Sequence, residues 1–161
     1  MKDYLKILAE LGKNFENTGT IFPSSPYLAK ALCKSLINRE SAAKKIIEVG
    51  AGTGPITKRI INHLADDDEL TICKINKDLF TLLKQNLSEY APYQERKAQI
   101  QLINQPIQKI EQENYYNDII CSLPFLNFPV KLSEEIFTKL SIISANNSNL
   151  TYFSYLGMKT F

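Results

Sequence analysis

The sequence predicts an α/β fold in which a mostly parallel β-sheet carries helices on both faces. From about residue 45 onward, short runs of apolar and β-branched residues alternate with longer segments that have the apolar spacing of helices. Polar and glycine-rich turns separate these segments, and no internal repeat or low-complexity stretch interrupts the alternation. Repeated strand–helix units build parallel sheets, because each return to the sheet crosses its face through a helix.

Composition predicts one globular domain over residues 1–161. The chain has 161 residues, of which 44% are hydrophobic and 22% are charged, enough for one substantial core. Its net charge of +2 argues against nucleic acid as a partner. Three cysteines without a C-x-x-C spacing and a single histidine predict buried free thiols and no metal site. No signal peptide or membrane-spanning run is evident, so we expect a cytoplasmic protein, at most peripheral at the inner face of the membrane.

The first 38 residues predict two helices joined by a linker. Apolar residues at spacings of three and four predict an amphipathic helix from Met1 to about Asn17, and two prolines make residues 21–26 an irregular linker. A second helix is expected from Pro26 to about Asn38, with Ser25 as its cap. The apolar face of the first helix either covers the sheet or lies on an anionic membrane; it carries Leu5, Leu8, Leu11 and Phe15, with Lys2, Lys6 and Lys13 nearby.

The sheet core is predicted over residues 45–155. Its predicted strands are Lys45–Val49, Glu69–Ile75, Ile100–Ile103, Asp118–Cys121 and Leu150–Tyr155. Its predicted helices run from Pro55 to about Leu64, from about Asp78 to Tyr90, over Ile107–Gln112 and over Ser133–Ile143. In an open sheet of this kind a ligand binds at the carboxyl ends of the strands, where the strand order reverses. The residues that follow each strand are therefore candidate site residues.

A glycine-rich loop follows the first predicted strand, in the sequence Glu48-Val49-Gly50-Ala51-Gly52-Thr53-Gly54-Pro55. Glycines at such a turn permit positive φ and let a ligand approach the backbone, while the helix that follows presents free N–H groups. The loop differs from dinucleotide- and phosphate-binding loops, since Pro55 replaces the third glycine of G-x-G-x-x-G and no Gly-Lys-Ser/Thr follows. The carboxylate of Glu48 would repel a pyrophosphate but suits an ammonium or a sulfonium.

Three segments of the chain carry a resemblance to known enzymes. The E-V-G-A-G-T-G segment resembles the first motif of class I S-adenosylmethionine (SAM)-dependent methyltransferases. Together with residues 19–29 (GTIFPSSPYLA) and 122–129 (SLPFLNFP), it resembles the bacterial phospholipid N-methyltransferases, relatives of the rRNA adenine dimethyltransferases. The resemblance implies a Rossmann-like class I methyltransferase fold and SAM as cofactor. It also implies methyl transfer to a phospholipid headgroup amine, such as that of phosphatidylethanolamine, with a phospholipid or a membrane surface as partner.

The same resemblance implies roles for individual residues. The loop after the fourth strand would hold the acceptor amine through backbone carbonyls, with an aromatic ring beside it, so the catalytic candidates are Ser122, Leu123, Pro124 and Phe125. The first strand and its glycine loop would bind the methionine end of the cofactor, the end of the second strand its ribose, and the end of the third its adenine. The cofactor-binding candidates are Glu48, Gly50, Ala51, Gly52, Thr53, Gly54, Lys74, Ile75, Asn76, Gln105, Pro106 and Ser122.

Three departures from the family pattern keep other functions open. Lys74 stands where the family has a Glu that binds the ribose hydroxyls, and Gln105 stands in place of an Asp that binds adenine. The chain also ends just past the fifth predicted strand, so it lacks the two C-terminal antiparallel strands expected of this fold. A degenerate, non-catalytic relative is therefore one alternative. An RNA adenine N6-methyltransferase is another, although Ser122 stands where the rRNA branch would have Asn. The sequence predicts no particular oligomeric state.

Overall fold

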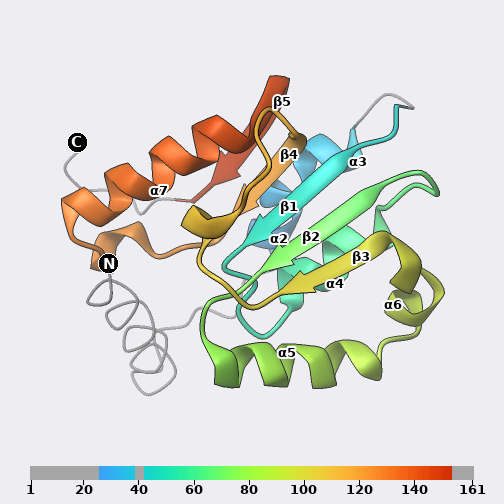
Figure 1. Cartoon of the computed structure of the whole chain (residues 1–161). Coiled ribbons are helices and arrows are strands. Elements are labelled where there is room, and N and C mark those ends of the chain that lie inside the picture. Colours follow the sequence, from blue (N-terminus) through green and yellow to red (C-terminus); the bar gives the residue numbers. More distant parts are fainter. Residues whose placement is uncertain (1–25, 39–41, 154–161) are drawn as a thin grey trace.

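A five-stranded, entirely parallel sheet forms the centre of the molecule (Figure 1). The computed structural model describes residues 26–38 and 42–153. The strand order is β3-β2-β1-β4-β5, so β1 lies in the middle, and the order reverses between β1 and β4. The strands are β1 Lys45–Val49, β2 Glu69–Cys73, β3 Ile100–Ile103, β4 Tyr116–Cys121 and β5 Ser144–Tyr152.

Helices cover both faces of the sheet and bury two separate apolar clusters against it (Figure 1). The central strand supplies both clusters, because Ile46 points to one face and Ile47 to the other. One face carries α2 Pro26–Leu32, α3 Lys34–Ile37, α4 Pro55–Asn62, α5 Lys77–Ser88 and α6 Ala91–Glu95. The other face carries α7 Val130–Ile143 and the short 3₁₀ turn η2 Ile107–Lys109. The predicted parallel sheet with helices on both faces is confirmed.

Several predicted element boundaries were wrong. The predicted helix over residues 26–38 is interrupted at Cys33, and the predicted helix Ile107–Gln112 is only a 3₁₀ turn. Strand β2 stops at Cys73, two residues before its predicted end, and β4 begins two residues before its predicted start. Helix α7 begins directly after Pro129, three residues before its predicted start, because that proline already supplies the extended residue that precedes a helix. Helix α6 was not predicted.

The largest correction concerns β5, predicted as Leu150–Tyr155. It begins at Ser144, immediately after α7, and its register against β4 shifts between Tyr116 and Asp118. Asn147 adopts a φ of 59° within this irregular stretch. Pairing with β4 therefore makes a strand of a polar segment whose sequence has no strand pattern.

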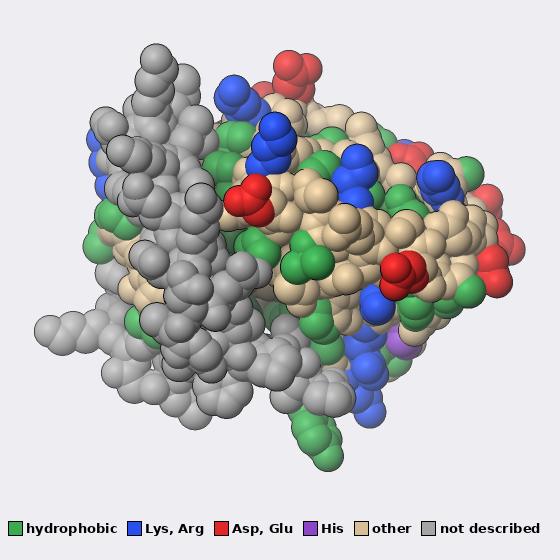
Figure 2. All heavy atoms as spheres, turned by 90° about the horizontal axis from the view of Figure 1, so that it is seen from below, with side chains coloured by type: hydrophobic (Ala, Val, Ile, Leu, Met, Phe, Trp, Pro, Cys, Tyr) green, Lys and Arg blue, Asp and Glu red, His purple; other side chains and the backbone are tan. Residues whose placement is uncertain are grey.

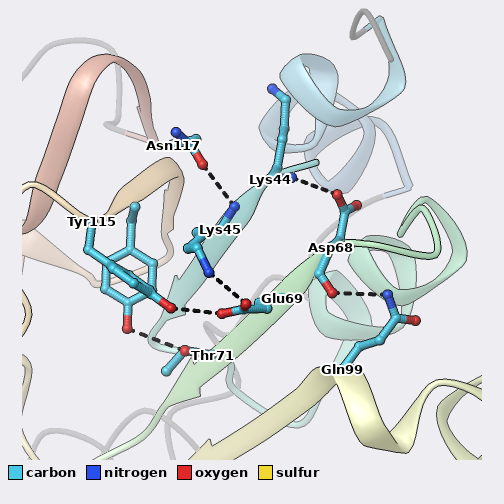
Figure 3. Close-up of polar contacts among 9 residues, drawn as sticks. Lys44, Lys45, Asp68, Glu69, Thr71, Gln99, Tyr115 and Asn117 are labelled. Atoms are coloured by element: carbon cyan, nitrogen blue, oxygen red, sulfur yellow. Dashed lines mark hydrogen bonds and ion pairs between the residues drawn. The ribbon is translucent and has the colours of Figure 1, made fainter. Parts of the chain in front are cut away.

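A polar network links the amino-terminal ends of β1 and β2, at the end of the sheet opposite the candidate site (Figure 3). The Lys45 ammonium lies 2.6 Å from a Glu69 carboxylate oxygen, and the Tyr115 hydroxyl donates to the other oxygen at 2.7 Å. The Lys44 N–H donates to Asp68 at 2.8 Å. The Lys44 ammonium also forms an ion pair with the buried Asp118 carboxylate of β4.

Other expectations concern membranes, metals, cysteines and the sheet edge. In residues 26–38 and 42–153, no helix is long and apolar enough to cross a membrane, and no group of three or more His, Cys, Asp or Glu could hold a metal ion. The three cysteines are free and buried, as predicted. Within this same part of the chain the sheet ends at β5, and no antiparallel strand accompanies it. The predicted amphipathic helix over residues 1–17 lies outside the described residues.

Candidate cofactor and acceptor site

The glycine loop after β1 adopts the backbone conformation that its glycines permit. Gly50, Gly52 and Gly54 have φ values of 87°, 55° and 105°, in the region that side chains disfavour. A Cβ at Gly50 would lie 3.0 Å from Leu123 Cδ2 and 3.2 Å from the Ser122 carbonyl carbon. A Cβ at Gly52 would meet no heavy atom of residues 26–38 and 42–153 within 4 Å. The loop thus packs against the segment after β4 at its first glycine and borders open space at its second.

Beneath this loop lies the carboxylate of Glu48, which is fully buried in β1. The Thr57 hydroxyl of α4 donates to Glu48 Oε2 at 2.6 Å, whereas Oε1 has no hydrogen-bond partner among the described residues. Burial raises the pKa of this carboxyl to about 7, and the Thr57 hydrogen bond and the positive charge of Lys74 oppose that rise. A buried acceptor without a donor costs free energy, which a cation or an N–H donor within reach of Oε1 would recover.

The ends of β2 and β3 lie side by side, and the charge of Lys74 after β2 acts on Glu48. The Lys74 N–H donates to Ile103 O at 3.1 Å, and the Asn104 amide donates to the carbonyls of Lys74 and Ile75 at 2.7 and 3.1 Å. Asn76, a ribose candidate, uses its side-chain oxygen to cap α5 by accepting the Leu79 N–H at 2.9 Å. This role of Asn104, which links the ends of β3 and β2, was not predicted from the sequence. Its position directly after a predicted strand was the signal that could have identified it.

Gln105 and Pro106, the adenine candidates, lie on the turn after β3. Both are half-buried. The side-chain amide nitrogen of Gln105 is 3.5 Å from Lys109 O. The backbone carbonyl of Gln105 accepts from the Cys73 thiol at 3.1 Å. The Gln105 side-chain hydrogen bond is at the limit of length, so it would be readily exchanged for a ligand.

The acceptor loop leaves β4 next to the glycine loop. The Ser122 N–H donates to Val49 O at 2.8 Å, which fixes the two loops side by side. The carbonyls of Leu123 and Pro124 each accept an N–H of the same loop, at 3.0 Å, and each retains a second lone pair for an acceptor amine. The buried Ser122 hydroxyl has no hydrogen-bond partner within the described residues.

The aromatic ring of Phe125 is held in a cluster. It stacks on Phe137 of α7 at 4.5 Å between ring centroids, and it meets the rings of Phe128 and Tyr152 edge-on at 5.9 and 6.2 Å. Phe128 is buried, and Phe125 remains half-buried at the surface. The rings of this loop therefore join the core, and the ring of Phe125 also borders the candidate site.

Comparison with known proteins gives one relative by sequence. No family model matches the chain. An ornithine lipid N-methyltransferase of Singulisphaera acidiphila is 27% identical over 139 residues, which cover 85% of this chain and 70% of that protein.

Solved structures share the fold at low sequence identity. A proposed SAM-dependent methyltransferase from Methanococcus maripaludis aligns with a TM-score of 0.63 and 15% identity, over 92% of this chain and 62% of its own. A SAM-dependent methyltransferase from Aquifex aeolicus aligns with a TM-score of 0.63 and 11% identity, over 88% and 71%. This chain thus has the Rossmann-like class I methyltransferase fold, as predicted. It spans less than two thirds of the first of these structures. The similarities support the predicted enzyme class and its cofactor.

Proposed function

We propose that this chain is a SAM-dependent N-methyltransferase that methylates the amine of a lipid headgroup. The observation that carries the proposal is the buried Glu48 carboxylate, whose Oε1 has no partner among the described residues beneath a glycine loop that borders open space. This arrangement fits a ligand with a cationic end. The sequence relative supports a lipid acceptor, and we take ornithine lipid as the first candidate and phosphatidylethanolamine as the second.

The proposed chemistry needs positioning more than acid–base catalysis. When bound, SAM supplies an electrophilic methyl group on a sulfonium. The carboxylate of Glu48 and the backbone of residues 50–54 would hold its methionine end. The carbonyls of Ser122, Leu123 and Pro124 would orient the acceptor nitrogen toward that methyl group. The amine must be neutral to attack, and the apolar surroundings of Phe125 disfavour its charged form.

Lys74 gives this site an electrostatic property of its own. Its positive charge acts on Glu48 and lowers the pKa of that carboxyl, against the effect of burial. Lys74 would therefore help to keep Glu48 ionised for a cationic ligand, and its ammonium would donate to a ribose hydroxyl. The non-catalytic alternative differs in one testable respect, because it predicts no specific binding of SAM.

Calorimetric titration with SAM tests the cofactor site. In the Gly52→Ala variant the new methyl group points into open space, so the protein should fold while SAM binding weakens by about tenfold or more. The matched control is Asn114→Ala, because Asn114 has a φ of 49° and the alanine would bear a similar backbone cost away from the loop. Equal SAM affinity in folded Gly52→Ala protein would remove the cofactor from this loop. Absence of binding to the unmodified chain would favour the non-catalytic alternative.

Transfer of labelled methyl groups tests the acceptor. We expect label from SAM in ornithine lipid or phosphatidylethanolamine presented in mixed micelles, and none in unmethylated rRNA. On the face shown in Figure 2, acidic and basic side chains of the described residues are interspersed, with no basic patch of the kind that binds nucleic acid. Label in RNA instead of lipid would refute the proposed acceptor and support the RNA alternative.

A further inference from the structure

Three large apolar side chains stand half-exposed around the acceptor loop. Leu126, Val130 and Tyr152 are each 48% exposed, and we call this group the acceptor rim. Leu126 and Val130 each stand two residues from the buried Phe128 in the sequence, one within the loop and one at the start of α7. Tyr152 ends β5 and pairs in register with Cys121, the residue before the loop begins. Three different elements around the acceptor loop thus each carry one half-exposed apolar side chain.

The acceptor rim is continuous with the aromatic cluster of the site. The ring of Tyr152 meets Phe125 at 6.2 Å and Phe137 at 5.3 Å, both edge-on. The ring of Phe128, between the two aliphatic rim residues in sequence, meets Phe125 at 5.9 Å. Ring contacts therefore link Phe125, beside the candidate acceptor position, to the half-exposed ring of Tyr152.

We propose that the acceptor rim binds the apolar stem of an amphiphilic acceptor while its amine reaches the loop carbonyls. This inference rests on the proposed function and adds to it the surface that would bind the apolar part of the acceptor. A water-soluble amine would make no use of the rim, whereas an acyl chain would cover it and gain the free energy of apolar burial. The rim suits one chain better than a protein partner, because three half-exposed side chains offer far less than the roughly 800 Å² per partner of a stable protein interface.

The test compares acceptors that share a headgroup and differ in acyl chain length, below their micellar concentrations. For the unmodified chain, kcat/KM should rise with chain length, by up to about fourfold for each methylene that the rim covers. The rim variant Leu126→Ser/Val130→Ser should lose this rise and retain its activity on the shortest acceptor. Leu82→Ser/Ile142→Ser is the matched control, since these residues are 38% and 41% exposed on α5 and α7, and it should keep the rise.

A second variant covers the case in which the double substitution disturbs folding. Tyr152→Phe keeps the ring and should behave like the unmodified chain, whereas Tyr152→Thr removes the apolar ring, keeps a residue that suits a strand, and should flatten the dependence on chain length. In every variant the affinity for SAM should stay unchanged.

The outcomes separate this inference from the proposed function. Methylation with no dependence on chain length, or an equal loss in the rim and control variants, would refute the rim and leave the enzyme in place. A dimer in light scattering that the rim variant dissociates would also refute it, because a second copy would then be the occupant. Failure to methylate any amine with SAM would refute the proposed function, and the rim with it.

Discussion

Replacing Glu48 by Gln should make the stability of the protein less dependent on pH. The folded state raises the pKa of this buried carboxyl from its ordinary value of 4.5 to about 7. Between these two pH values the folded chain holds a proton that the unfolded chain has released. Stability therefore falls as pH rises through this window.

The magnitude follows from the displacement of the pKa. Each pH unit is worth about 1.4 kcal/mol, so ionising Glu48 costs the folded state roughly 3 kcal/mol above pH 7. Between about pH 5 and pH 8 the loss should be about 2–3 kcal/mol in the unmodified chain and absent at this position in Glu48→Gln. The Gln side chain has a cost of its own if its NH₂ group occupies the place of the unpartnered Oε1, because a buried donor would then lack an acceptor. That cost does not vary with pH.

Urea unfolding at several pH values measures this effect. The difference in unfolding free energy between Glu48→Gln and the unmodified chain should shift in favour of the variant as pH rises. Asp67→Asn is the matched control, since it removes an exposed carboxylate from a turn and should show no such trend. A difference that is constant across the pH range would show that Glu48 is not held in the buried, poorly hydrogen-bonded state described above.

Three further predictions concern the packing and charge of the site and of the opposite edge. Gly50→Ala should destabilise the fold by about 1–3 kcal/mol in thermal or urea unfolding, because the new methyl group would lie 3.0 Å from Leu123 and the φ of Gly50 is positive. Unchanged stability would mean that the two loops are not packed as described. Asp118→Ala should cost about 3–5 kcal/mol, since it leaves the largely buried Lys44 ammonium without its carboxylate, and Lys44→Met in the same chain should recover part of that loss. Lys74→Glu should add an acceptor for a ribose diol, worth about tenfold in SAM binding by calorimetry, but it also removes the positive charge that lowers the pKa of Glu48, so the gain should appear only about one pH unit or more above that pKa. Weaker binding at every pH would place the ribose elsewhere.

Much of the fold was determined by local sequence pattern. Apolar residues at consecutive positions, such as Ile46 and Ile47, predict a strand buried on both faces, because alternate side chains point to opposite sides of a sheet. The glycines after β1 and Pro55 likewise predict the turn and the helix start, since few other residues accept those backbone angles.

Long-range pairing decided what the sequence alone could not. The polar segment that begins at Ser144 is a strand only because β4 offers its edge, with a bulge absorbing the mismatch in register. The stacking of Phe125 on Phe137 depends on where α7 crosses the sheet.

The same holds for the charges of the candidate site. The sequence shows the glycine loop and the acidic residue before it. The burial of Glu48, in contrast, follows from the packing of β1 between β2 and β4 and from the contact with α4. The influence of Lys74 on that carboxylate follows from the pairing of β1 with β2. Local pattern determines which segments form strands and helices, whereas the pKa of a side chain depends on neighbours distant in sequence, and only the tertiary structure brings those neighbours together.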